Sequence, residues 1–213
     1  MNKNTIKSFI ETLGSADTNK FGGKFTGGIY LQQIPDELAN AIVFIGDTLA
    51  LKNNINNYLE IGPASGGLTY IVNHYFKPKS ILLIDTNEHP LHTIRSSVLK
   101  NIDRIEISGN SHSKFIKNRL HDYCRKYYSF NLVVIDGDHS YDGVKQDLEL
   151  IKPYLNRDSL VFLHDIGESS DPQIKVSELR KEILEGSHWL EEVFATFSKE
   201  QEPLGIGLYK LKC

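Results

Sequence analysis

From about residue 57 onward, the chain alternates short apolar stretches with longer stretches in which apolar residues recur at helical spacing. Strands that are almost continuously apolar and alternate with helices are typical of a parallel sheet that helices cover on both faces. The sequence therefore predicts a doubly wound α/β domain. The expected strands span residues 57–61, 80–85, 104–108, 130–136 and 159–165. The expected helices between them span residues 67–76, 89–101, 113–127 and 140–155.

The two ends of the chain differ from this alternating centre. Residues 25–50 begin with a Gly-Gly break and continue with Pro35, acidic residues and an apolar stripe, which predicts an accessory helix against the sheet. A further helix is expected at 173–184. The strand-like stretches 188–197 and 206–212 follow, with too few residues between them for a helical crossover, so they are expected to pair as an antiparallel hairpin.

We expect two parts in the chain. Residues 1–28 are an N-terminal helix and a flexible segment, in which the glycine-rich residues 22–28 would act as a hinge or lid. Residues 29–213 form a single domain, because this length suffices for one good-sized α/β core. Tyr30 and Gln32 would either close over a ligand or simply dock the accessory helix.

The stretch "LEIGPASGG" joins the first expected strand to the first helix of the sheet. It places Glu60 at the strand end and Gly62, Gly66 and Gly67 in the turn, beside the crevice where a doubly wound fold binds its ligand. The glycine spacing does not match the G-x-G-x-x-G fingerprint of dinucleotide-binding folds. A carboxylate here suits an ammonium or sulfonium group better than a pyrophosphate, which favours S-adenosylmethionine over a nicotinamide cofactor.

Two strand ends carry the expected cofactor-binding residues. Asp85 ends the second strand, where an acidic side chain accepts hydrogen bonds from ribose hydroxyls in either kind of cofactor. The alternative for the turn is structural, with glycines that make it tight and a carboxylate that caps it. The residues expected to bind the cofactor in and before the turn are Glu60, Gly62, Pro63, Ser65 and Gly66.

Five stretches together resemble the class I S-adenosylmethionine-dependent methyltransferases in their order and spacing: "YLEIGPASGGLT", "ILLIDTN", "ISGNSHS", "FNLVVIDGDHSYDGVKQDL" and "SLVFLHD". The resemblance covers roughly residues 28–212. It is strongest to the branch of macrolide-sugar O-methyltransferases and cephalosporin-hydroxylase-like proteins, and weaker to catechol-type O-methyltransferases. It implies a Rossmann-like sheet of strand order 3-2-1-4-5-7-6 with an antiparallel last strand and helices on both faces. It also implies that Asn110 and Ser111 contact the adenine.

Polar side chains follow the fourth and fifth expected strands where these strands end. Asp136 closes the fourth strand, His139 lies three residues later, and His164 and Asp165 close the fifth. The carboxyl ends of parallel strands border one crevice, so these side chains should share a pocket. Asp136, His164 and Asp165 would offer two carboxylate oxygens and one imidazole nitrogen to a divalent cation.

The resemblance gives these residues roles. In the metal-dependent members, the acid that ends strand four and two adjacent residues that end strand five bind the metal, which corresponds to Asp136, His164 and Asp165. The residue three positions after the first ligand is the general base, here His139. The family usually has a carboxylate where His164 stands. An imidazole softens the site, so Mn²⁺, Fe²⁺ or Zn²⁺ would serve as well as Mg²⁺.

The alternative for this cluster is polar capping of strand ends. Asp142 would favour the N-terminus of the following helix, and Asp138 would hydrogen-bond the turn. The remaining histidines, which include His112, have no comparable grouping and are expected mostly at the surface. Cys124 and Cys213 lack metal-type spacing and are expected to be reduced thiols.

We therefore predict an S-adenosylmethionine-dependent methyltransferase that methylates a hydroxyl of a small molecule, a sugar or a phenol, with metal assistance. The alternatives are a nicotinamide-dependent oxidoreductase and a non-catalytic cofactor-binding relative. The net charge of −3 argues against nucleic acid as a partner. Without an apolar leader or a stretch of 18 apolar residues, a cytoplasmic protein that does not enter a membrane is expected. The accessory N-terminal segment offers a surface for a homo-oligomer.

Overall fold

A single seven-stranded sheet organises the chain. The structure is a computed structural model that describes residues 1–14, 28–50, 55–127, 129–198 and 204–212. The strand order is β3-β2-β1-β4-β5-β7-β6, and β7 runs antiparallel to both of its neighbours, which confirms the expected fold and hairpin. The strands are β1 (Asn57–Ile61), β2 (Ser80–Asp85), β3 (Ile105–Ser108), β4 (Phe130–Ile135), β5 (Leu155–His164), β6 (Leu190–Thr196) and β7 (Ile206–Leu211).

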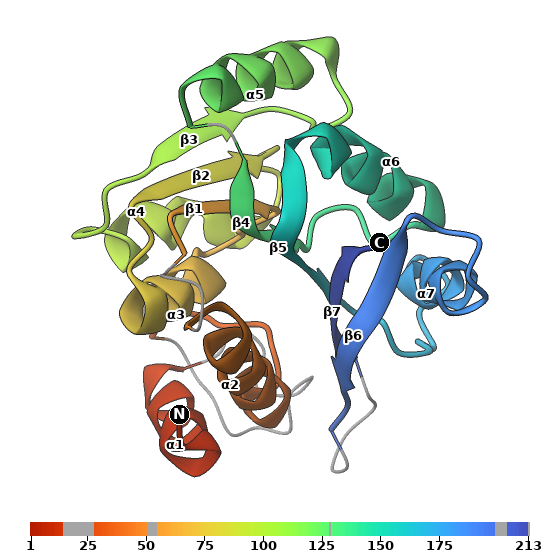
Figure 1. Ribbon diagram of the computed structural model, residues 1–213. Helices are drawn as coiled ribbons and strands as arrows, with labels where there is room; N and C mark the ends of the chain where they lie inside the picture. Colours follow the sequence, from red (N-terminus) through yellow and green to blue (C-terminus); the bar gives the residue numbers. More distant parts are fainter. Residues whose placement is uncertain (15–27, 51–54, 128, 199–203, 213) are drawn as a thin grey trace.

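Helices cover both faces of the sheet (Figure 1). Helices α1, α2 and α3 pack on one face, and α5, α6 and α7 pack on the other, each set around its own buried apolar cluster. The N-terminal helix α1 packs on α2 through Ile6 and Ile10. Most of the expected glycine-rich hinge, residues 22–27, lies outside the described residues. The helices are α1 (Lys3–Leu13), α2 (Pro35–Ala50), α3 (Gly67–Phe76), α4 (Arg95–Val98), α5 (Lys114–Tyr127), α6 (Tyr141–Ile151) and α7 (Val176–Leu184).

Two expected helices are shorter than the sequence pattern indicated. The helix expected at 89–101 is a 3-10 turn, Pro90–Ile94, followed by the single turn α4. The helix expected at 140–155 ends at Ile151, because Pro153 has no N–H to continue the hydrogen-bond ladder, and a 3-10 turn leads directly into β5. Strand β5 is correspondingly longer at its start than expected. Asp165 leaves this strand with a left-handed φ of +57°.

Side-chain alternation along the central strands decides which polar residues meet. In β1, Tyr58 packs with the α1–α3 cluster, whereas Leu59 packs with the α5–α7 cluster. Strands β4 and β5 alternate in the same way. Because side chains two residues apart share a face, three polar residues point toward the layer that contains α2 and α3. These residues are Glu60, Asp136 and His164.

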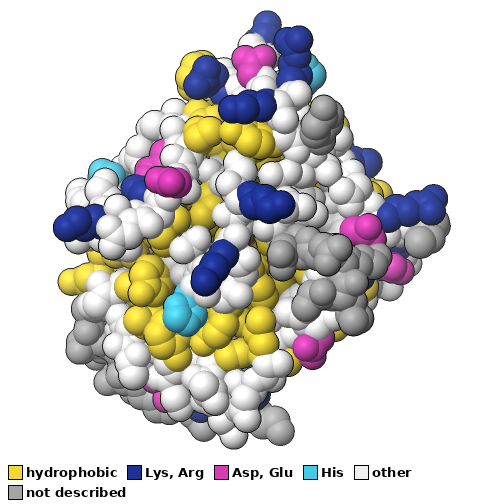
Figure 2. Space-filling view, turned by 60° about the vertical axis from the view of Figure 1, so that its left-hand side comes forward, with side chains coloured by type: hydrophobic (Ala, Val, Ile, Leu, Met, Phe, Trp, Pro, Cys, Tyr) yellow, Lys and Arg dark blue, Asp and Glu magenta, His cyan; other side chains and the backbone are white. Residues whose placement is uncertain are grey.

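The described surface mixes side chains of all kinds. On the face shown in Figure 2, hydrophobic side chains lie between separate Lys and Arg side chains, with Asp and Glu among them. The described part of this face therefore has no extended surface of a single charge sign. Within the described ranges, every helix is too short or too polar to cross a membrane.

We predict that Gly62→Ala destabilises the protein more than Gly186→Ala does. Gly62 has φ +81°, and an added Cβ would overlap the backbone carbonyl of Asp136. Gly186 has a similar φ of +86° but nothing within 4 Å of its Cβ position. Both variants incur about 1–2 kcal/mol for a left-handed residue, and only Gly62→Ala adds a steric overlap. Urea unfolding measures both losses, and equal losses would contradict the prediction.

Candidate functional site

A cavity of about 860 Å³ opens at the carboxyl ends of β1, β2, β4 and β5. Its size lies within the range of ligand-binding clefts. Eight of the predicted site residues line it, namely Gly62, Asp85, Asn110, Ser111, Asp136, His139, His164 and Asp165. Glu60, Pro63 and Ser65 instead line a small neighbouring pocket, and Gly66 lines neither. The structure thus brings most, but not all, of the predicted residues to one place.

The glycine turn after β1 is held mainly by contacts with neighbouring segments of the protein. The hydroxyl of Ser65 donates to the carbonyl of Ile29 at 2.8 Å and also accepts from the N–H of Gly67 at 3.1 Å. An added Cβ on Gly66 would overlap the side chain of Leu99. Ser65 and Gly66 therefore hold the turn against its neighbours, while Gly62 faces the cavity.

The carboxylate of Glu60 is buried beneath α3. It accepts hydrogen bonds from the hydroxyl of Tyr58 at 2.6 Å and from the hydroxyl of Thr69. Burial raises the pKa of Glu60 to about 7, although these two hydrogen bonds favour its charged form. Glu60 shares a face with Asp136 but pairs with Val134, two residues earlier in β4, so it lies beneath α3 and does not reach the cavity.

Arg95 fixes Asp85 against the glycine turn. Its Nη2 lies 2.6 Å from Oδ2 of Asp85, and its Nε donates to the carbonyl of Ala64 at 2.8 Å. Asp85 also accepts from the N–H groups of Asn87 and Ala64. Asp85 remains part of the cavity wall, now in a fixed orientation. Arg95 was missed in the sequence because it lies within an expected amphipathic helix, where a basic residue usually faces solvent.

The turn after β3 contacts a buried acid of α6 that the sequence did not reveal. Oδ1 of Asn110 accepts from the N–H of His112 at 2.8 Å. Nε2 of His112 lies 3.2 Å from Oδ1 of Asp147, whose side chain is buried in α6. Burial raises the pKa of Asp147 to about 6. His112 lines the cavity beside Asn110 and Ser111, a position that the sequence did not single out among the remaining histidines.

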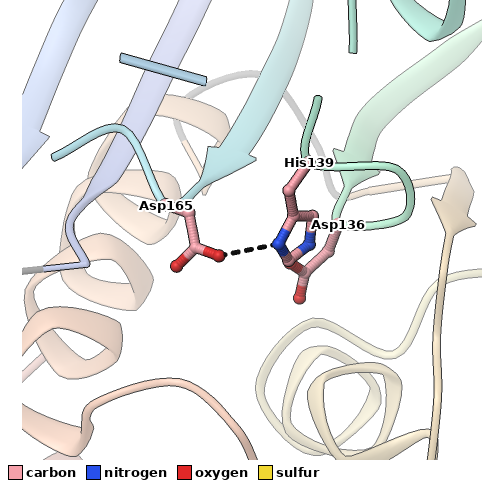
Figure 3. A group of neighbouring side chains, drawn as sticks. All are labelled: Asp136, His139 and Asp165. Atoms are coloured by element: carbon pink, nitrogen blue, oxygen red, sulfur yellow. Dashed lines mark ion pairs between the residues drawn. The ribbon is translucent and has the colours of Figure 1, made fainter. Parts of the chain in front are cut away.

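Asp136, His139 and Asp165 form a compact group at the mouth of β4 and β5 (Figure 3). Nδ1 of His139 lies 2.9 Å from Oδ2 of Asp165, and its Nε2 lies 3.3 Å from Oδ1 of Asp136. One ligand atom from each residue lies within 4.8 Å of the other two. Oδ1 of Asp165 is buried and accepts no hydrogen bond from the described residues. Two carboxylates and an imidazole so arranged fit a divalent cation.

His164 contacts the same carboxylates from within the sheet. Its Nδ1 lies 3.0 Å from Oδ1 of Asp136 and 3.3 Å from Oδ1 of Asp165. Its Nε2 is buried and has no hydrogen-bond partner among the described residues. Glu37, fully buried in α2, lies close enough for its charge and that of His164 to interact. The sequence did not reveal Glu37, because nothing local indicates which strand its helix covers.

The charges of this cluster compensate one another. Burial disfavours a charge on His139, but hydrogen bonds and charges from Asp136 and Asp165 outweigh it and raise its pKa to about 11. The same carboxylates raise the pKa of His164 to about 9 against the effect of burial. The histidines in turn keep the pKa values of both carboxyls below their usual range. Two negative and two positive charges thus balance.

We predict that Glu60→Gln becomes more favourable for stability as pH rises. The pKa of Glu60 is raised to about 7 in the folded chain, from 4.5. The free energy of unfolding of the wild type therefore decreases as pH rises from about 4.5 to about 7, because ionisation of Glu60 is less favourable in the folded state. The variant lacks this loss, so its free energy of unfolding relative to wild type should be higher at pH 8 than at pH 4, by on the order of 3 kcal/mol. Urea unfolding at both pH values measures it, and a pH-independent difference would contradict the prediction.

Solved structures of low sequence identity share this fold. The O-methyltransferase from Bacillus cereus in complex with SAH is 14% identical, with a TM-score of 0.60 over 81% of each chain. MycE methyltransferase in complex with Mg, SAH and mycinamycin VI is 17% identical, with a TM-score of 0.55 over 79% of this chain and 48% of its own. An rRNA methylase from Streptococcus thermophilus is 11% identical, with a TM-score of 0.60 over 83% of this chain and 97% of its own.

Sequence comparison identifies the family. No curated protein sequence matches the chain. The sequence profile of a family described as a methyltransferase domain matches residues 59–166, which run from the second half of β1 to just beyond β5. These residues are slightly more than half of the chain and contain the glycine turn and the polar residues at the ends of β4 and β5. The chain therefore belongs to this family of methyltransferase domains.

Proposed function

We propose that the protein transfers a methyl group from S-adenosylmethionine to a hydroxyl of a small molecule, with a divalent cation at the ends of β4 and β5. The observation that carries the proposal is the convergence of Asp136, His139, His164 and Asp165 at one side of a cavity whose other side contains Asp85. When bound, S-adenosylmethionine supplies the methyl group, and the cation lowers the pKa of the acceptor hydroxyl and aligns it.

The roles of the two histidines follow from their exposure. The side chain of His164 is 5% exposed and directs Nδ1 at both carboxylates, which suits a third ligand beside Asp136 and Asp165. The side chain of His139 is 31% exposed and lines the cavity, so an acceptor hydroxyl can reach it. His139 takes up the proton of that hydroxyl. To do so it must start neutral, a requirement that is met once the charges of Asp136 and Asp165 are offset by a cation.

The cavity wall supports a polyhydroxylated acceptor, such as a sugar, over a phenol. No Phe, Tyr or Trp occurs among the described residues that line the cavity. An aromatic acceptor would therefore lack the stacking partners that usually hold a ring. Hydrogen-bonding side chains surround the outer part, including Glu88, Asp138, Asp171 and Gln173. Such groups match several hydroxyls on one small molecule.

We expect S-adenosylhomocysteine to raise the melting temperature, and Mn²⁺ or Mg²⁺ to raise it further. A ligand at a hundredfold excess over its Kd adds about 2.7 kcal/mol, which corresponds to roughly 5–10 °C for a chain of this size. Asp136→Asn should lose the increment from the metal and keep the increment from S-adenosylhomocysteine. Differential scanning fluorimetry measures both, with NAD as the control cofactor. A shift with NAD alone would contradict the proposal.

The variants His139→Ala and His164→Ala should distinguish the general-base role of His139 from the metal-ligand role of His164. His139→Ala should lower the methyl-transfer rate by about 10²–10⁴ and leave Mn²⁺ affinity within a few-fold of wild type. His164→Ala should weaken Mn²⁺ binding itself. Isothermal titration with Mn²⁺ and a rate assay with a panel of sugar acceptors measure the two effects. The reverse pattern would make His139 the third ligand, an arrangement that its short distances to both carboxylates also permit.

A further inference from the structure

The segment between residue 28 and α2 lies directly against the glycine turn. The carbonyls of Ile29 and Tyr30 accept from the hydroxyl of Ser65 at 2.8 and 3.2 Å. An added Cβ on Gly67 would lie 3.0 Å from the carbonyl oxygen of Ile29, so the two chains are already in close contact. The position of this segment relative to the sheet is therefore closely constrained.

Gln33 extends from this segment to the proposed metal site. Its side-chain Nε2 donates to Oδ2 of Asp136 at 2.7 Å, across 103 residues of sequence. Gln33 is 5% exposed. The other oxygen of Asp136, Oδ1, is the one that lies 3.0 Å from His164 and 3.3 Å from His139. Each oxygen of this carboxylate therefore has its own partners.

The chemistry of Gln33 suits this position. A neutral amide donates a hydrogen bond to an ionised carboxylate without adding a charge that would compete with a cation. The neighbouring Gln32 lines the cavity, and burial alternates from Leu31 to Gln33, as in an extended chain whose successive side chains face opposite ways. The two adjacent glutamines thus differ in surroundings, which makes Gln32 a matched control.

We propose that Gln33 is a positioning residue that holds the carboxylate of Asp136 in the orientation required for metal binding. This inference rests on the metal site of the proposed function. Without the amide, rotation of the carboxylate is no longer restrained on its Oδ2 side. Hydrogen-bond partners of metal ligands typically contribute 10–100-fold to metal affinity. Gln33 lies outside residues 59–166, so this support comes from a part of the chain that the family match does not include.

Isothermal titration with Mn²⁺ tests the inference on wild type, Gln33→Met, Gln33→Asn and Gln32→Met. Methionine keeps the size of the side chain and removes the donor. Asparagine keeps an amide but shortens its reach, which covers the case in which Gln33→Met does not fold. Both Gln33 variants should raise the Kd for Mn²⁺ by about 10–100-fold. Their Kd for S-adenosylhomocysteine, measured without metal, should stay within about twofold, and Gln32→Met should bind Mn²⁺ as wild type does.

Three outcomes would overturn the inference, and each is distinct. Unchanged Mn²⁺ affinity in Gln33 variants of a wild type that binds Mn²⁺ would remove the role of Gln33 and leave the proposed function intact. Equal weakening of Mn²⁺ and S-adenosylhomocysteine binding, with a lower melting temperature, would assign Gln33 a purely structural role. A wild type that binds S-adenosylhomocysteine but no Mn²⁺ would remove the metal site and with it the role of Gln33.

Discussion

The two-residue period of side chains along the parallel strands is the constraint on which the site depends. Strands β1, β4 and β5 lie in the middle of the sheet and end at the same edge. In each strand, the pairing that buries the apolar side chains also fixes the face of the sheet on which the terminal polar side chain lies. A shift of one residue would turn Glu60, Asp136 and His164 toward the α5–α7 layer and put apolar residues in the places where these polar groups now meet. The same register that packs the core thus assembles the site.

Burial of these polar residues costs free energy because they lose their contacts with water, and a different set of partners compensates each one. Glu60 relies on two hydroxyl donors, Asp85 on the guanidinium of Arg95, and Asp136 on two imidazoles and an amide. An uncompensated buried charge would cost several kcal/mol. Several of the supporting groups lie outside the strands, namely Thr69 in α3, Arg95 in α4 and Gln33 in the segment before α2. The layer of structure around the sheet is therefore part of the site.

The sequence predicted the features that depend on local pattern. Apolar periodicity predicted the strands and the hairpin, and the strand ends predicted that Asp85, Asp136, His139, His164 and Asp165 line the cavity. The positions of helix ends were less predictable where Pro90 and Pro153 interrupt an otherwise helical pattern. Alternation along β1 predicts the face that Glu60 shares with Asp136 and His164, whereas its position beneath α3 depends on how that helix packs. Gln33 was not predictable, because its contact joins residues 103 positions apart and nothing local indicates which strand its segment crosses.

The charge balance at the ends of β4 and β5 has a consequence for how the protein is made. Small metal-dependent domains often fold only when their ion binds, because the free energy of metal binding is what stabilises their folded state. Here two imidazolium groups already neutralise two carboxylates. If the proposed cation binds at these residues, folding can precede its binding, which would then release protons from the two histidines.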